Sequence, residues 1–271
     1  MSQESVTELS GQRMASLLRG SLFRPELYHH YALLDSSNRQ AAEWAQQGAA
    51  EGTVVVAEQQ SQGRGRLGRH WFSPVGINLY CSLLLRPAVA PRHAPQLTLL
   101  AGLALWKTVQ QWGIEECRLK WPNDLLLRGR KAAGILTEMR AEGEKTHYVI
   151  VGIGVNLNGS RGDFPDPLQE QAIHLAEALP FTIDRGLFLA DLLLQWEALY
   201  GDYLQKGCAP LAAEWWRVAD WAGRPLSVRL ADRSFVGEAV TLDADGCLLV
   251  RCADGMLTRV VAGDVALLGE D

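Results

Sequence analysis

The segment from Gln60 to Trp71 has a composition suited to binding an anion. It reads Gln-Ser-Gln-Gly-Arg-Gly-Arg-Leu-Gly-Arg-His-Trp and follows a short run of β-branched residues. Glycines let backbone N–H groups approach an anion closely, and arginines add charged, bidentate donors. The segment is neither a Walker loop, whose Gly-Lys-Ser/Thr ending is missing, nor a dinucleotide fingerprint. We therefore predict a phosphate-type ligand, with a solvated basic loop as the competing interpretation.

A second chemical signal is the sequence Lys-Trp-Pro-Asn-Asp at residues 120–124, which is followed closely by Lys131. Proline cannot donate to a central strand ladder, so the chain should turn at Pro122 and expose Asn123 and Asp124 at a strand end. Sites are often built from such turns. Taken separately, however, the Pro-Asn-Asp sequence is only a turn and Lys131 only a surface lysine.

Helices and strands alternate through most of the chain and would position these two segments. Apolar residues at helical spacing predict a helix over residues 95–112. Asp35 or one of the serines after it would cap a helix within residues 32–49, and Asp184 and Gly207 would begin and end a long helix. Apolar runs predict strands over residues 53–57 and 76–87, and a strand pair over 124–140 and 146–158 joined by a polar turn.

The sequence changes character after Trp221. Short strand-like runs are separated there by Asp245-Gly246 and Asp254-Gly255, which are strong hairpin signals. About fifty residues of this kind predict a small antiparallel barrel. We therefore divide the chain into residues 1–221 and residues 222–271.

Composition limits the class of protein. The 271 residues are 48% apolar and 21% charged, with a net charge of -5, so general affinity for nucleic acid or an anionic membrane is not expected. We find no signal peptide and no apolar stretch of about 18 residues, and we predict a cytoplasmic protein. The five cysteines form no Cys-x-x-Cys pair and are expected to be reduced thiols rather than metal ligands.

Together the two segments resemble the biotin protein ligase family, which carries a GRGRxGRxW loop, a KWPND turn and an RKxAGIL strand in this order. They stand here at residues 63–71, 120–124 and 130–136. The resemblance extends to Asp-Ser-Ser-Asn at 35–38, to Ala57-Glu58, to Gly-x-Gly-x-Asn at 152–156 and to the final barrel. It implies an α+β fold: a mixed-sheet catalytic domain of the class II synthetase/biotin ligase type, followed by a small all-β SH3-like barrel.

The resemblance also implies an activity and a set of site residues. ATP, with Mg²⁺, would activate biotin to biotinyl-5′-AMP, and a lysine of a biotin carboxyl carrier domain of a carboxylase would then receive the biotin. The catalytic residues would be Arg64, Arg66, Lys131 and Asp124. Asp124 would orient the acceptor amine, with magnesium coordination or stabilisation of the turn as alternative roles. Biotin would contact Ser36, Ser37, Asn38, Gln60, Gly63, Arg64, Gly65, Arg66, Lys131, Gly134 and Gly152; ATP would contact Arg66, Arg69, Asn123, Lys131 and Asn156; no resident metal site is expected.

Several expectations concern partners and moving parts. A lipoate or octanoate ligase relative and a non-catalytic biotin-sensing module are the alternative functions. The chain lacks the winged helix of the family's repressors, so no DNA binding is expected, and the oligomeric state is left open between a monomer and a homodimer. Trp71 is expected to stack on the ligand or to join the core. Residues 158–171 are expected to close over the adenylate and to be mobile without ligand. The barrel is expected to lie outside every ligand motif and to assist carrier docking.

Overall fold

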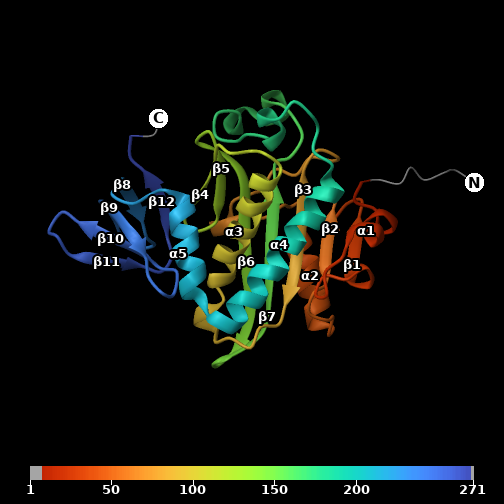
Figure 1. Ribbon diagram of the computed structural model, residues 1–271, viewed down its shortest axis with the longest axis horizontal. Coiled ribbons are helices and arrows are strands. Elements are labelled where there is room, and N and C mark those ends of the chain that lie inside the picture. The colour runs from red at the N-terminus through yellow and green to blue at the C-terminus, as the bar shows by residue number, and fades with distance from the viewer. Residues whose placement is uncertain (1–7, 270–271) are drawn as a thin grey trace, which may run out of the picture.

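A seven-stranded mixed sheet forms the body of the protein in the computed structural model, which describes residues 8–269 (Figure 1). Neighbours β1 and β2 pair in parallel, and the other neighbouring strands pair antiparallel. This confirms the predicted mixed sheet. Its spatial order is β1 (Tyr28–Tyr31), β2 (Val54–Ala57), β3 (Leu79–Leu85), β7 (Lys145–Val155), β6 (Arg130–Glu142), β5 (Asp124–Leu127) and β4 (Cys117–Lys120).

The predicted strand over residues 124–140 is wrong in one respect, because it contains two strands. β5 and β6 are joined by a two-residue turn at Arg128-Gly129, where both residues have positive φ, 50° and 75°. Positive φ at both central residues is the geometry of the tight hairpin turn that Asn-Gly usually signals. The sequence did not indicate this turn, because arginine is unusual in its first position.

Helices cover both faces of the sheet. On one face α3 (Gln96–Gln111) packs against the strands and against α4 (Arg185–Lys206), and α5 (Cys208–Ala219) packs beside them (Figure 1). The ends of α4 are as predicted: the Asp184 side chain accepts from the Leu187 N–H, and Gly207 follows with φ 75°. The short helix α1 (Gly11–Leu17) packs near α4 and β1.

The opposite face carries α2 (Ser37–Gln46). Ser36, one of the predicted residues, holds the N-cap position, but its side chain makes no capping hydrogen bond. Ala41 and Ala45 of this helix pack on Val55, Leu84 and Ile150 of the sheet. Those contacts cover only part of the face. Every residue of β3 is buried nevertheless, because helices and the loop that follows β2 enclose both of its sides, so the strand does not alternate in burial.

A five-stranded antiparallel sheet lies beside β4 and α5 and forms the C-terminal part (Figure 1). Its hairpins turn at Gly246 and Gly255, both with positive φ, as the sequence predicted. Its spatial order is β11 (Leu257–Val260), β10 (Leu248–Cys252), β9 (Ser234–Leu242), β8 (Pro225–Arg229) and β12 (Asp264–Leu267). The last of these strands was not predicted.

The C-terminal sheet shares one hydrophobic core with the larger sheet. Leu248, Val250 and Val260 belong to the same buried cluster as α3 and α5. The Trp121 indole N–H donates to the Gly246 carbonyl at 3.1 Å across this contact.

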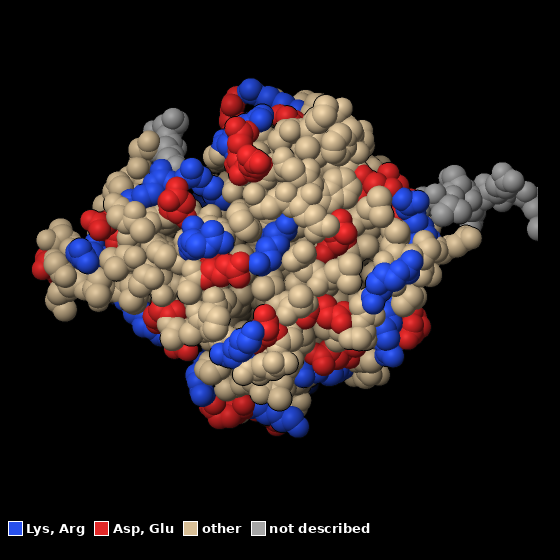
Figure 2. Space-filling view, viewed as in Figure 1, with Lys and Arg blue, Asp and Glu red and all other residues tan. Residues whose placement is uncertain are grey.

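Short 3₁₀ turns complete the described chain: η1 (Pro25–Leu27), η2 (Arg66–Gly68), η3 (Pro91–His93), η4 (Arg161–Asp163), η5 (Asp166–Leu168) and η6 (Leu175–Ala178). No helix within residues 8–269 is long and apolar enough to cross a membrane. On the face shown in Figure 2, basic and acidic side chains are interspersed rather than gathered by sign.

Candidate active site

Two rungs of the central sheet form the floor of a pocket on the part of the face that α2 leaves uncovered. Glycines in both rungs remove side chains from the middle of the floor, so other groups can lie against the backbone. The rungs run across the sheet as Ser82, Gly152 and Leu136, and as Tyr80, Gly154, Gly134 and Asp124. The pocket and its opening to solvent together hold about 440 Å³ of space.

The pocket brings together nine of the predicted site residues from four separate segments. They are Ser36, Ser37, Asn38, Gln60, Arg64, Gly65, Lys131, Gly134 and Gly152. The other six, Gly63, Arg66, Arg69, Asn123, Asp124 and Asn156, are not among the lining residues. The lining also contains residues that the site prediction omitted: Trp71, Tyr80, Cys81, Ile135, Leu136, Ile153 and Gly154.

A buried polar network forms one end of the pocket, at the start of α2. The Ser37 N–H and hydroxyl both donate to Gln60 Oε1, at 2.8 and 3.1 Å. The hydroxyl of Ser82 lies 2.8 Å from Ser37 Oγ and 2.6 Å from Asn38 Oδ1. Asn38 Nδ2 donates to Glu138 Oε2 at 2.9 Å. Ser82 was missed, although a serine within the apolar sequence LYCSLLL was a signal for a buried polar site.

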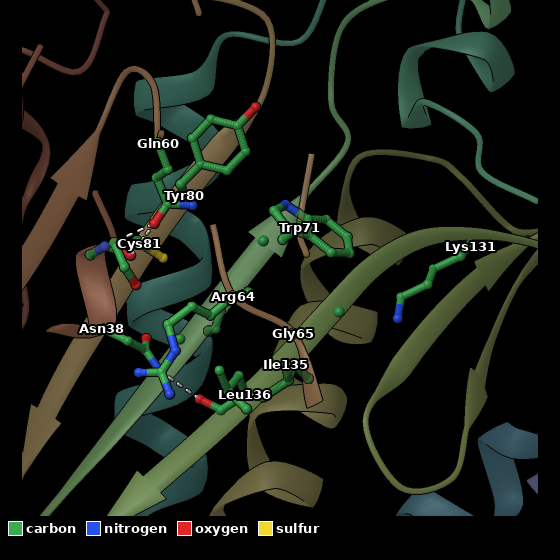
Figure 3. Close-up of a pocket in the computed structure, with 16 residues that line it drawn as sticks. Asn38, Gln60, Arg64, Gly65, Trp71, Tyr80, Cys81, Lys131, Ile135 and Leu136 are labelled. Carbon is green, nitrogen blue, oxygen red and sulfur yellow. Dashed lines mark hydrogen bonds between the residues drawn. The ribbon is translucent and has the colours of Figure 1, made fainter. Parts of the chain in front are cut away.

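The floor glycines make room for two side chains. A Cβ on Gly152 would lie 2.0 Å from Asn38 Oδ1, and a Cβ on Gly154 would lie 2.6 Å from the Trp71 ring. Gly134 faces the same ring, and a Cβ added to Gly134 would lie 3.0 Å from Trp71 Cζ3. The Trp71 Nε1 is buried and has no hydrogen-bond partner within the described residues. Trp71 therefore lies in the pocket, between the Arg64 and Asn38 end and Lys131 (Figure 3).

The arginine loop is a tight hairpin. Gly63 accepts the Trp71 N–H at 2.9 Å, and the Gly65 N–H donates to the Arg69 carbonyl at 2.7 Å. A Cβ on Gly63 would lie 2.3 Å from the Trp71 carbonyl, so this position requires glycine. Its glycines have the spacing of a dinucleotide fingerprint, but a single 3₁₀ turn follows rather than the helix that a fingerprint needs.

The three loop arginines point in different directions. Arg64 faces the pocket and pairs with Glu138 at 3.0 Å. Arg66 donates to Asn123 Oδ1 at 2.8 Å and to the Gly263 carbonyl at 3.3 Å. Arg69 pairs with Asp264.

Both Gly263 and Asp264 belong to the C-terminal part, so the expectation that the barrel lies outside every ligand motif is wrong. Its last turn holds two arginines of the loop. The sequence could not show this contact because nearly two hundred residues separate the partners.

Lys131 reaches the pocket because of a β-bulge. The bulge between Leu125 and Leu126 changes the register between β5 and β6, and it places Lys131 on the same face as Gly134. Its ammonium lies 2.7 Å from Asp124 Oδ1 and 5.5 Å from the centre of the Trp71 ring. The Asp124 side chain is only 16% exposed and pairs with Lys131, so the prediction that the turn exposes Asp124 is wrong.

Segment 158–171 is bound to the backbone of Lys131. The Lys131 N–H donates to the Gln171 carbonyl at 2.8 Å, and the Ile173 N–H donates to the Lys131 carbonyl at 3.1 Å. Asn156 is buried and donates from Nδ2 to the same carbonyl, which places it behind Lys131 rather than in the pocket. Mobility of the segment stays a prediction.

Burial determines the ionisation of Tyr80 and Cys81, which line the pocket from β3. It raises the pKa of Tyr80, and it raises the pKa of the Cys81 thiol to about 12, so both groups stay neutral at physiological pH. Cys81 is therefore a poor candidate nucleophile. The pocket combines a neutral polar end, a floor of glycine backbone, an aromatic ring and the two cations Arg64 and Lys131. These groups suit a small polar molecule with a carboxylate and a phosphate beside it.

Comparison with known proteins identifies two family models along the chain. Residues 31–156 match the biotin/lipoate A/B protein ligase family, and residues 222–268 match the biotin protein ligase C terminal domain. The bifunctional ligase/repressor BirA of Bacillus subtilis is 38% identical over 89% of this chain and 73% of its own length. The biotin–[acetyl-CoA-carboxylase] ligase of Paracoccus denitrificans is 34% identical over 81% of this chain and 92% of its own length.

Solved structures agree with these matches. A biotin protein ligase from Aquifex aeolicus in complex with biotin and ATP aligns with a TM-score of 0.76 and 27% identity, covering 89% of this chain and 97% of that one.

Proposed function

The chain belongs to the biotin protein ligase family, and we propose that it uses ATP to activate biotin to biotinyl-5′-AMP and then transfers biotin to a lysine of a carboxylase carrier domain. One observation carries the proposal. Arg64 and Lys131 lie at opposite sides of a glycine floor, with a buried polar network at one end. The Aquifex aeolicus structure, which holds biotin and ATP, supports the choice of both substrates.

Biotin fits the polar end. Its fused rings are largely apolar, and its ureido group needs both donors and acceptors. Ser36, Ser37, Asn38 and Gln60 are buried and supply hydroxyl and amide groups there. Ser37 bonds to Gln60, and Ser82 links Ser37 to Asn38, so the orientation of these three side chains is fixed before the ligand arrives, which lowers the entropic cost of binding.

In the first half-reaction a biotin carboxylate oxygen attacks the α-phosphorus of ATP. The bond from that phosphorus to the bridging oxygen breaks, and pyrophosphate leaves with the electron pair. Two unit negative charges 4 Å apart repel by about 4 kcal/mol at an effective dielectric near 20, so the meeting point needs fixed cations. Arg64 and Lys131 supply them, once the substrates replace Glu138 and Asp124 as their partners.

The nucleotide would extend from the floor toward the turn that contains Asn123. Trp71 lines the pocket, where its ring could stack on the ligand, and its buried N–H has no partner in the part of the chain that the structure describes. Arg66 and Arg69 would contact phosphates after leaving their present partners, and Asn156 would support Lys131 from behind.

Mg²⁺ would arrive on the phosphates rather than in a site of the protein. No group of three or more His, Cys, Asp or Glu suited to a metal occurs within residues 8–269. Mg²⁺ commonly keeps its waters and binds one or two carboxylates together with substrate phosphates, and Asp124 is the carboxylate available here. The ion would neutralise charge on the triphosphate.

In the second half-reaction a carrier lysine attacks the carbonyl carbon of the adenylate, and AMP leaves. The attacking amine must be neutral, whereas a free lysine has a pKa near 10.4. Asp124 is placed to orient the amine and accept its proton, because it lies at the end of the floor rung beside Lys131. We place this reaction in the cytoplasm, which the five free thiols support.

Biotin-dependent exchange of labelled pyrophosphate into ATP tests the first half-reaction directly. We expect exchange with biotin and none with lipoate or octanoate at the same concentration. Exchange that depends on lipoate or octanoate would favour the lipoate-type alternative. Binding of biotin without any exchange would favour a non-catalytic biotin sensor.

A further inference from the structure

His174 is a buried histidine that the proposed reaction does not use. Its side chain is 1% exposed, and its Nε2 has no hydrogen-bond partner within residues 8–269. Burial lowers the pKa of the ring, and the nearby carboxylates of Glu177 and Asp163 offset part of this shift. The ring is therefore neutral at pH 7, and a proton on it would place a charge in the interior.

The His174 ring packs against two parts of segment 158–171. It stacks on Phe164, with ring centroids 4.2 Å apart and an interplanar angle of 19°. Phe164 is buried, although the residues around it are polar. A Cβ on Gly159 would lie 2.7 Å from the His174 ring, so the backbone at the start of the segment lies directly against the ring. One side chain thus holds the beginning and the middle of the segment near its end.

The backbone on both sides of His174 is bound to the active site. The Ile173 N–H donates to the Lys131 carbonyl at 3.1 Å, and the Leu175 N–H donates to the Asn156 carbonyl at 2.9 Å. Displacing the His174 ring would therefore disturb the hydrogen bonds that fix the backbone beside Lys131.

The charged groups around the ring would compensate a proton poorly. Glu177 Oε1 lies 4.0 Å from His174 Nδ1, beyond hydrogen-bonding distance, and it already accepts the His174 backbone N–H at 3.1 Å. Glu177 also pairs with Arg130 at 3.6 Å. Asp163 accepts from the N–H and the hydroxyl of Ser160, at 2.7 and 3.0 Å. A protonated ring would therefore be more stable in water than in this position.

We propose that the neutral ring of His174 positions segment 158–171 beside Lys131, and that protonation of the ring releases the segment and weakens retention of the nucleotide. The effect on the nucleotide rests on the proposed function, whereas the release does not. A released ring has a pKa near 6.5, and the pKa of the buried ring is lower. The folded segment is therefore most stable above pH 6.5, and this stability is lost as the pH falls toward the lower pKa.

Hydrogen exchange of the ligand-free protein measures the release of the segment. Between pH 7.5 and 5.5 we expect protection of the amides of residues 159–175, corrected for intrinsic exchange rates, to fall by up to about tenfold. The reason is that each pH unit between the two pKa values changes the equilibrium tenfold. His174→Phe keeps an aromatic ring for the stack but cannot be protonated, so its protection should stay constant over this range.

His147→Phe is the matched control. The His147 side chain is 36% exposed and faces Glu142 at the far end of the β6–β7 hairpin, so this variant should keep the pH dependence of the parent. Protection in the parent that does not change with pH would overturn the proposal, and so would an equal loss of protection in the parent and in His174→Phe. If phenylalanine lowers the melting temperature, His174→Gln serves the same comparison, because it is also neutral at every pH.

The KM for ATP tests the effect on the nucleotide. Between pH 7.5 and 5.5 it should rise more for the parent than for His174→Phe, by up to about tenfold, because only the fraction with a folded segment retains the nucleotide. Protonation of ATP itself affects both proteins equally. A KM for ATP that changes alike in both would overturn this effect. If the parent shows no biotin-dependent pyrophosphate exchange at either pH, it is the proposed function that fails, and the hydrogen-exchange result stands.

Discussion

Replacing Lys131 by alanine should abolish adenylate formation and leave the fold intact. Its ammonium lies 2.7 Å from Asp124, but the lysine side chain is 34% exposed. Such a partly exposed ion pair contributes about 1 kcal/mol or less, so the free energy of unfolding should change little.

The loss of activity has two sources in this geometry. Removing one preorganised group that stabilises developing charge costs about 2.7 to 4 kcal/mol, or 10²- to 10³-fold in rate. The substitution also leaves the Asp124 carboxylate unopposed beside the phosphate, which adds repulsion. We therefore expect pyrophosphate release to fall at least about 10³-fold. The double variant with Asp124→Asn should recover part of this loss.

The assay is biotin-dependent pyrophosphate release, with thermal unfolding followed in parallel. Lys107→Ala is the matched control, because Lys107 pairs with Glu214 at 2.6 Å and its side chain is 30% exposed. Both variants should unfold alike, and only Lys131→Ala should lose activity. A folded Lys131→Ala variant that releases pyrophosphate within tenfold of the parent rate would refute the assigned role.

Four further changes test other parts of the site. Arg66→Gly should keep part of adenylate synthesis but leak biotinyl-AMP at least about tenfold faster, because it removes a charged donor for the adenylate phosphate and also the bonds to Asn123 and Gly263 that order the loop. Unchanged labelling of bystander albumin, at equal turnover, would contradict this. Gly152→Ala should weaken biotin binding about tenfold or more by displacing Asn38, as titration calorimetry would show. Deleting residues 222–271 should lower the melting temperature, because it exposes the hydrophobic core that both sheets share. It should also weaken carrier biotinylation. A soluble truncated protein that biotinylates the carrier at the parent rate would exclude docking by this part. Glu58→Gln should lower the free energy of unfolding at pH 7 by up to about 3 kcal/mol. In acid the variant and the parent should be equally stable.

The pH dependence of the last variant follows from the surroundings of Glu58. Burial alone would raise its pKa, but hydrogen bonds from His30 and Arg185 lower it below the ordinary value. A lowered pKa means that the ionised form stabilises the fold above the unfolded pKa, near 4.3, and that this contribution disappears as the pH falls through the folded pKa. Denaturation curves of variant and parent that stay equally far apart at pH 7 and below pH 4 would contradict this pH dependence.

Local sequence determined the elements whose signals are local. The caps at Asp184 and Gly207, the Asp-Gly hairpins of the C-terminal sheet and the helix at 96–111 all depend on neighbouring residues, and they appear where the sequence placed them. The turn at Arg128-Gly129 was missed because its first residue is unusual for that geometry.

Contacts between distant segments account for most of what the sequence could not show. Glu138 holds both Arg64 and Asn38, and Asp264 holds Arg69, but no spacing rule connects these pairs. Lys131 faces the pocket only because a bulge changes the strand register. The motifs therefore indicated which segments meet, and the register decided which side chains face the ligand.

The most direct test of the proposed activity is the intact mass of a carboxylase carrier domain after incubation with the protein, ATP, Mg²⁺ and biotin. We predict that one biotinyl group is added, that the addition requires ATP, and that it disappears when the acceptor lysine of the carrier is replaced. A carrier of unchanged mass, tested beside a ligase known to modify it, would contradict the account.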